Sequence, residues 1–292
     1  MKGLSTVPQH KSQQGYLTFA QNTDSVNYLD LAFVQAMNIK CTQKINEYAV
    51  VVDKQTELEI TEEHKKIFDH IIVLEEDYAE NSKWKLSNEW QVFKLTPFKE
   101  TIKLESDLLF TRSIDHWWNT FRLQDIVLST GCLDYKGNQS RVRTYRQFFD
   151  DNGLPDIYNG LMYFRYTKTA WNFFNTAESV FKNWSELSDR ALKNCRESSP
   201  STDVLYAVTA NLIGVENCTL PSADFIKFVH MKPAINEFPN KAWFESVISE
   251  RDGDMIRVNN LNQYSPVHYF EKTYITEEII NEYRTRCSRF LE

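Results

Sequence analysis

The first two-thirds of the chain alternates strand-like and helix-like segments, and no other feature restricts its fold as strongly. Strand-like runs occur at residues 15–22, 47–53 and 69–77, and helix-like runs separate them at 24–43 and 56–68. In the first helix, Asp24 is expected to be the N-cap residue. Strands that alternate with helices favour a mostly parallel sheet covered by helices, so we expect an α/β fold.

Two acids follow a buried strand in the segment TIKLESDLLF, residues 101–110. The apolar run predicts a strand inside a sheet, where an ionised carboxylate needs a cation or several hydrogen-bond donors. Glu105 and Asp107 therefore indicate a metal site or a solvent-filled crevice at the carboxyl end of this strand. The alternative is a strand that simply leaves the sheet through an acidic turn.

A histidine far downstream would complete such a site. His230 lies near the end of the strand-like run 223–231 and is followed by Lys232. Two carboxylates and an imidazole suit Mn²⁺ or Mg²⁺, and a lysine beside them would neutralise phosphate oxygens. A single histidine is also common as an ordinary structural residue, and that interpretation remains open.

The length and composition allow one large domain or two unequal ones. Of the 292 residues, 42% are hydrophobic, which is enough to bury a sizeable core. We expect a principal domain, residues 1–239, with an extension, residues 240–292, packed on it. No apolar run is long enough to span a bilayer, and the five cysteines lack the spacing of a zinc site. These features predict a cytoplasmic protein with reduced thiols and no membrane insertion.

The order of the motifs resembles that of the retaining glycosyltransferases of family 8, the group that contains glycogenin and galactinol synthase. That family has a strand, a polar loop and a helix with a tyrosine, then an acidic metal motif, a further acid, and finally a histidine followed by lysine and proline. The matching positions here are Tyr28, Glu105, Asp107, Asp115, His230, Lys232 and Pro233. The resemblance covers about residues 16–235.

This resemblance implies the GT-A nucleotide-sugar-binding fold, with a mostly parallel central sheet flanked by helices and a C-terminal helical extension. It also implies metal-dependent sugar transfer from a UDP-sugar, with Glu105, Asp107 and His230 holding Mn²⁺ or Mg²⁺. The implied donor-binding residues are Tyr28, Asn22, Glu105, Asn159, Gly160 and Lys232. Asp203 is the implied catalytic residue, with a helix N-cap as its alternative role, and Tyr28 has core packing as its alternative.

Two positions depart from the family pattern. Glu105 stands where the family usually has an aspartate, so its carboxylate is one methylene farther from the backbone. A lysine that is common in the family about sixteen residues before the acidic motif falls near Glu89. These departures leave open a protein that binds nucleotide sugars without turnover. A nucleotidyltransferase is disfavoured because the segment FAQNTDSVN contains no glycine for a phosphate-binding loop.

A cluster of arginines and a further resemblance indicate the acceptor. The formal net charge of −7 gives no general attraction to nucleic acid, so a polyanion would need a local patch. Arg141, Arg143 and Arg146 lie among aromatic residues and could contact DNA phosphates, or could form a solvated, ion-paired loop. The chain also resembles glycosyltransferase-like proteins of large tailed bacteriophages. We therefore expect hydroxymethylated DNA as the acceptor, in the host cytoplasm, with a glycan or lipopolysaccharide as the alternative.

Overall fold

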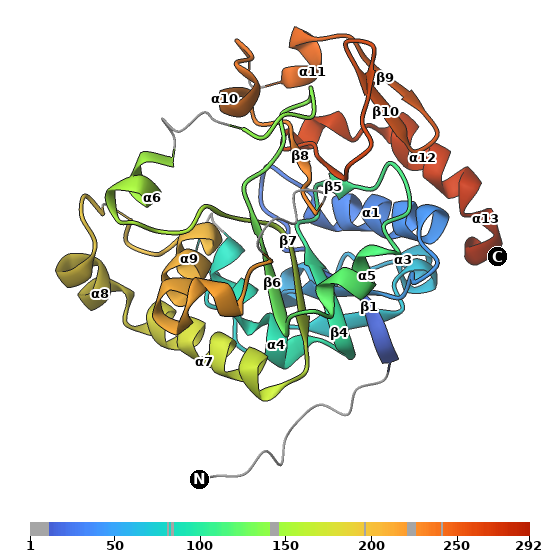
Figure 1. Ribbon diagram of the computed structural model, residues 1–292. Coiled ribbons are helices and arrows are strands. Elements are labelled where there is room, and N and C mark those ends of the chain that lie inside the picture. The colour runs from blue at the N-terminus through green and yellow to red at the C-terminus, as the bar shows by residue number, and fades with distance from the viewer. Residues whose placement is uncertain are drawn as a thin grey trace.

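A sheet in the order β3-β2-β1-β4-β7-β6 forms the centre of the molecule (Figure 1). The computed structural model describes residues 12–80, 82, 85–140, 146–195, 197–220, 226–240 and 242–292. The strands of this sheet are β1 (Ser12–Phe19), β2 (Tyr48–Val52), β3 (His70–Val73), β4 (Phe98–Leu104), β6 (Ile126–Thr130) and β7 (Ile157–Arg165). Strand β7 runs antiparallel to both of its neighbours, whereas β1, β2, β3 and β4 pair in parallel. The predicted mostly parallel sheet is confirmed.

Side chains of alternate strand residues enter two hydrophobic cores, one on each face of the sheet. In β2, Tyr48, Val50 and Val52 enter one core, and Ala49 and Val51 enter the other. This alternation is the period-two pattern of a strand that is buried on both faces. The central sheet is therefore covered on both sides, and ligands can reach it only at its ends.

Helix α1 (Tyr28–Thr42) packs on the first face and is buried almost all round. Its N-cap is Asn27, whose side chain accepts a hydrogen bond from the Asp30 amide at 3.1 Å, so the prediction of an Asp24 cap is wrong. Every residue from 31 to 40 is buried because α12 (Glu277–Arg286) covers the side of α1 that faces away from the sheet. The first face also carries α3 (Glu62–Ile67) and α5 (Trp117–Phe121).

The predicted helix at 56–68 is divided into two shorter helices. Asp53 caps α2 (Lys54–Glu57), and Thr61 starts α3 through a capping box with His64. Each cap satisfies backbone N–H groups at a helix start, so two caps eight residues apart produce two helices.

The second face is covered mainly by α7 (Lys168–Lys182) and α9 (Thr202–Ile213). In α7, the buried residues Ala170, Phe173, Phe174, Ala177 and Val180 recur at helical spacing and form its apolar stripe. The shorter elements along this part of the chain are η1 (Lys85–Gln91), α4 (Val92–Leu95), α6 (Gln147–Asp151), α8 (Trp184–Ala191) and η3 (Val215–Asn217).

The C-terminal part returns to the end of the main sheet instead of forming a separate layer. Strand β12 (Val267–His268) pairs with β5 (Leu108–Leu109) on one side and with β8 (Val229–His230) on the other. A second small sheet contains β9 (Ser249–Asp252), β10 (Met255–Val258) and β11 (Leu261–Asn262). The remaining elements are α10 (Pro233–Asn236), α11 (Trp243–Ser246), η4 (Lys272–Tyr274) and α13 (Ser288–Leu291).

The domain boundary after residue 239 stays a prediction. The segment beyond it contributes a strand next to the candidate site. It brings β12 to the carboxyl end of β4, beside the acidic turn. Among the described residues, no helix is both long and apolar enough to cross a bilayer.

Candidate functional site

Glu105 and Asp107 lie in the turn between β4 and β5, at the carboxyl end of β4. Backbone hydrogen bonds fix this turn on two sides. The Glu105 amide donates to the Gly160 carbonyl at 3.0 Å, and the Asp107 carbonyl accepts from the Tyr269 amide at 3.0 Å. The turn is therefore tied both to β7 and to the residue that follows β12.

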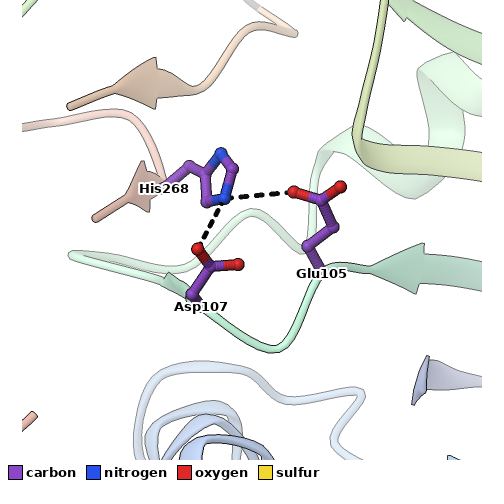
Figure 2. Close-up of side chains that lie close together, drawn as sticks. All are labelled: Glu105, Asp107 and His268. Carbon is purple, nitrogen blue, oxygen red and sulfur yellow. Dashed lines mark ion pairs between the residues drawn. The ribbon is translucent and has the colours of Figure 1, made fainter. Parts of the chain in front are cut away.

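His268 completes a compact group with the two acids. Its Nε2 lies 3.0 Å from Glu105 Oε2 and 2.8 Å from Asp107 Oδ2, and Figure 2 shows both carboxylates directed at this one nitrogen. One ligand atom from each of the three residues lies within 4.8 Å of the others. Because His268 comes from β12, residues about 160 positions apart in the chain meet here.

The group is held by strong electrostatic interactions. Burial would raise the pKa of Asp107, but the neighbouring His268 and Lys272 hold that pKa well below its usual range. Burial raises the pKa of Glu105, with partial opposition from His268. For His268, burial favours the neutral ring, but both carboxylates outweigh it and raise the pKa of the imidazole. A cation is therefore favoured at the point where the two carboxylates meet.

Lys272 lies beside this group, on η4. Its Nζ contacts Asp107 Oδ2, donates to the Phe270 carbonyl at 3.0 Å, and lies 5.9 Å from the centre of the Tyr28 ring. Asp107 and the tyrosine side chain thus share one ammonium group, and Lys272 lines a cavity together with both.

Two cavities meet at the group. The first, about 340 Å³, is lined by residues that include Phe19, Gln21, Tyr28, Lys85, Asp107 and Lys272. The second, about 430 Å³, is lined by residues that include Arg146, Tyr158, Asn159, Gly160, Asp203 and Lys232. Glu105 and His268 line both cavities. A bound molecule could therefore extend past the acidic turn from one cavity into the other.

His230 lies next to the group but outside it. Its ring stacks on the His268 ring, with the centroids 4.4 Å apart, and burial together with His268 holds the pKa of His230 well below its usual value. Within the described residues, the atoms that could share a metal come from Glu105, Asp107 and His268. The described residues thus group His268, and not the predicted His230, with Glu105 and Asp107, and Lys232 lines the second cavity.

Asn159, Gly160 and Asp203 form one wall of the second cavity. The backbone N–H of Asn159 donates to Asp203 Oδ1 at 2.8 Å. The side-chain oxygen of Asn159, Oδ1, is buried with no hydrogen-bond partner among the described residues. At Gly160, a Cβ would lie 2.7 Å from the Phe228 ring, so only glycine fits here without movement. Asp203 is not the N-cap of α9, because that position is Ser201.

Arg146 is a structural part of this wall. Its guanidinium pairs with Asp203 at 2.7 Å and Asp156 at 3.0 Å, and it lies between the rings of Phe149 and Tyr158. Only 4% of the residue is exposed, so the structure does not support a contact between Arg146 and DNA phosphates. The other two arginines of the predicted acceptor cluster, Arg141 and Arg143, lie outside the described residues.

Two further residues have structural contacts. The Asn22 side chain accepts a hydrogen bond from the Leu29 amide at 2.9 Å and donates one to Glu59 at 2.8 Å, so it fixes the loop before α1. Its contact with the nucleotide sugar stays a prediction. Asp115, the third acid of the motif, accepts from the amides of Lys44 and Ile45 and so holds the turn after α1. Neither residue lines the two cavities.

Glu89 occupies the position at which the family resemblance implies a lysine. Glu89 is buried and forms an ion pair with Lys103 of β4, which is itself completely buried. The lysines that line the first cavity are Lys85 and Lys272. Positive charge is therefore present in that cavity despite the missing lysine.

His268 and Lys272 were not predicted from the sequence. The segment VHYFEK does carry a signal, because it places a lysine four residues after a histidine that has apolar and aromatic neighbours. In the sequence analysis, the metal-ligand and phosphate-neutralising roles were assigned instead to His230 and Lys232 of the similar segment VHMK. The choice between them depends on the pairing of β12 with β5, which is a contact between distant parts of the chain.

The three side chains fit a divalent cation. Two carboxylates and one imidazole give a charged, mixed oxygen and nitrogen donor set, which suits Mn²⁺ and is compatible with Mg²⁺. The cavities on both sides leave space for ligands from a bound molecule. The structure thus contains a possible divalent-metal site at the carboxyl edge of the sheet.

Comparisons with known proteins agree with this architecture. No protein-family model matches the chain, and no curated protein matches its sequence. The galactosyltransferase LgtC in complex with donor and acceptor sugar analogues matches with a TM-score of 0.55 and 13% identity, over 93% of this chain and 95% of that one.

Two other solved structures give similar values. An active-site mutant of LgtC matches with a TM-score of 0.53 and 14% identity, over 93% of this chain and 95% of that one. The bifunctional glycosyltransferase WbbM matches with a TM-score of 0.51 and 11% identity, over 94% of this chain and 49% of that one. The chain therefore has the GT-A fold.

Proposed function

We propose that the protein is a metal-dependent glycosyltransferase, which moves a sugar from a nucleotide sugar to an acceptor hydroxyl. The proposed donor is a UDP-sugar. The observation that carries the proposal is the group of Glu105, Asp107 and His268 at the junction of two cavities. The LgtC structure, described as a galactosyltransferase with donor and acceptor sugar analogues, supports the same use of this fold. The order of motifs supports family 8 in particular.

The first cavity suits a nucleoside diphosphate. The Tyr28 ring offers a face for a base, and Lys85 and Lys272 offer charge for the phosphates. A Mn²⁺ or Mg²⁺ ion held by Glu105, Asp107 and His268 would supply further positive charge to a diphosphate. We assign the donor nucleotide to this cavity and the transferred sugar to the region beyond Glu105.

The reaction breaks the bond between the anomeric carbon and the diphosphate oxygen. The electron pair stays on that oxygen, while the acceptor oxygen bonds to the anomeric carbon and its proton passes to the departing diphosphate. Lys272 would stabilise the departing diphosphate more strongly as its negative charge increases, which lowers the barrier. In this scheme, Lys272 takes the leaving-group role that the sequence assigned to Lys232.

The second cavity would hold the sugar and the acceptor. Asp203 lines it, and its carboxylate would stabilise positive charge at the anomeric carbon or orient the acceptor hydroxyl. The buried Oδ1 of Asn159 lacks a partner among the described residues and would accept a hydrogen bond from a sugar hydroxyl. Retention of the anomeric configuration is part of the proposal and rests on the family resemblance.

A glycan is the favoured acceptor. The partly exposed aromatic side chains that line the second cavity, Phe148 and Phe270, would pack against the apolar face of a sugar ring. Hydroxymethylated DNA remains the alternative, but the pairing of Arg146 with Asp203 and Asp156 takes away one of the three arginines on which it depended.

The test is to incubate the protein with mixed UDP-sugars and Mn²⁺, offer glycans or hydroxymethylated DNA, and identify products by mass spectrometry. We expect a glycan product. The Asp203→Asn variant should form it at least roughly tenfold more slowly, whereas Asp115→Asn, which changes an acid outside the site, should form it at the normal rate. Transfer of sugar to DNA but not to glycans would show that DNA is the acceptor. Binding of UDP-sugar without transfer or hydrolysis would indicate a binding protein, and the absence of binding would overturn the proposal.

A further inference from the structure

Helix α1 carries two buried amide side chains that contact the acidic turn. Gln35 and Asn38 are one helical turn apart, are completely buried, and lie where an amphipathic helix would have apolar residues. A buried amide is costly unless it is hydrogen-bonded, so the partners of these two side chains explain why they occur here.

Gln35 holds the acidic turn on both sides of Asp107. Its Nε2 donates to the carbonyl of Glu105 at 2.6 Å and to the carbonyl of Leu108 at 2.7 Å. Its Oε1 accepts from the Tyr48 hydroxyl at 2.7 Å, which fixes the orientation of the amide. The polar atoms of this side chain are thus all directed either at the turn or at the residue that orients them.

Asn38 holds the strand that leaves the turn. Its Oδ1 accepts from the Phe110 amide at 2.7 Å, and its Nδ2 donates to the Phe110 carbonyl at 2.9 Å. Gln35 and Asn38 together therefore bond to the backbone at residues 105, 108 and 110. This short stretch contains Asp107 and has little regular secondary structure of its own.

We infer that Gln35 and Asn38 are positioning residues, which hold Glu105 and Asp107 in the geometry that binds the metal. The inference rests on the proposed metal site. A carboxylate pair binds a cation tightly only when both oxygens are directed at one point. The bonds from Gln35 and Asn38 to residues 105, 108 and 110 add to the two backbone bonds that tie the turn to Gly160 and Tyr269. The amides of α1 would therefore set the affinity of the site without contacting the ion.

Gln43 provides a matched control on the same helix. It is the C-cap of α1, is buried, and also bonds to a backbone segment, since its Nε2 donates to the Arg112 carbonyl at 3.1 Å and its Oε1 accepts from the Ile114 amide at 2.8 Å. These contacts lie beyond the acidic turn. Gln35→Met and Gln43→Met thus remove similar bonds, and only the first acts on the turn.

The experiment measures Mn²⁺ affinity by calorimetry and stability by urea unfolding, for the full chain and both variants. We expect both variants to lose stability, because each leaves buried backbone groups unpaired. Gln35→Met should weaken Mn²⁺ binding roughly 10–100-fold, and Gln43→Met should change it by less than about twofold. Should Gln35→Met fail to fold, Tyr48→Phe removes only the hydroxyl that orients the amide and should weaken Mn²⁺ binding about fivefold.

If Gln35→Met binds Mn²⁺ with normal affinity, the positioning role is overturned, whether or not the variant is less stable. The same holds for Tyr48→Phe if it is used because Gln35→Met does not fold. Equal losses of affinity in Gln35→Met and Gln43→Met would also overturn it, because they would reflect general destabilisation. If the unchanged protein binds no Mn²⁺, the proposed metal site itself fails, and this result is distinct from the others.

Discussion

At the scale of single residues, His268 Nε2 is the atom on which both carboxylates of the site converge, at 2.8 and 3.0 Å. The stacked ring of His230 lies behind it, 4.4 Å away between centroids. In the proposed metal site, His268 would bind the ion and His230 would support the ring of His268. The two roles can be separated because phenylalanine preserves the stacking but has no ligand atom.

We predict that His268→Phe weakens Mn²⁺ binding at least roughly tenfold, since one of three ligands is lost. His230→Phe should leave the affinity within about threefold of normal, because its ring only supports the ligand. Electron paramagnetic resonance of Mn²⁺ measures the bound fraction in both variants. The reverse order of effects would return the metal-ligand role to His230.

The sequence was sufficient to locate the acids but not the histidine. Glu105 and Asp107 are conspicuous because they end an apolar run, and burial makes charges there costly without a partner. His268 has no such local signal that distinguishes it from His230. Its place beside the acids depends on the register of β12 against β5, and register between distant strands is not visible in local patterns.

At the scale of elements, β4 is joined to η1 by the buried ion pair between Lys103 and Glu89. Asn159 of β7 also donates to the Glu89 carboxylate. The pair therefore links three elements beneath the junction of the cavities. Removing one charge would leave the other buried without a partner, which is more costly than replacing both.

We predict that Lys103→Met lowers the free energy of unfolding by about 3–5 kcal/mol. Adding Glu89→Gln should restore most of that loss, because the glutamine is neutral and can still accept from Asn159. Urea unfolding of the two single variants and the double variant completes the cycle. A double variant as unstable as the sum of the single variants would show that the two charges do not act as a pair.

Sequence patterns predicted the long elements better than the short ones. Strand β2 is a continuous apolar run and helix α7 has apolar residues at helical spacing, so both elements can be predicted from local residue order. The two-residue strands β5, β8 and β12 have too few residues for a pattern, and they form because the chain meets itself at the end of the sheet. In the candidate site, His268 lies on one of these short strands, and Glu105 and Asp107 lie in the turn before another.

At the scale of the whole molecule, the C-terminal segment completes both the core and the site. Helix α12 covers α1, where Asn38 bonds to the Tyr283 hydroxyl at 3.1 Å, and β12 brings His268 to the acids. The same segment supplies Lys272 on η4. Residues 240–292 are therefore expected to be required for folding as well as for metal binding.

We predict that a chain ending at residue 239 does not unfold cooperatively, because the outer side of α1 and much of the first core would be exposed. Thermal unfolding followed by circular dichroism measures this. A truncated chain that unfolds cooperatively and binds Mn²⁺ normally would contradict the assignment of His268 and would show that the boundary separates independent domains.

The most direct test of the account is calorimetric titration of UDP into the protein, with Mn²⁺ present and after chelation, for the unchanged chain and Asp107→Asn. The account predicts that UDP binds with Mn²⁺, that chelation weakens binding by at least roughly tenfold, and that Asp107→Asn binds weakly in both conditions. Circular dichroism of the variant checks that it is folded. Equal UDP affinity with and without Mn²⁺, unchanged in folded Asp107→Asn, would contradict the account.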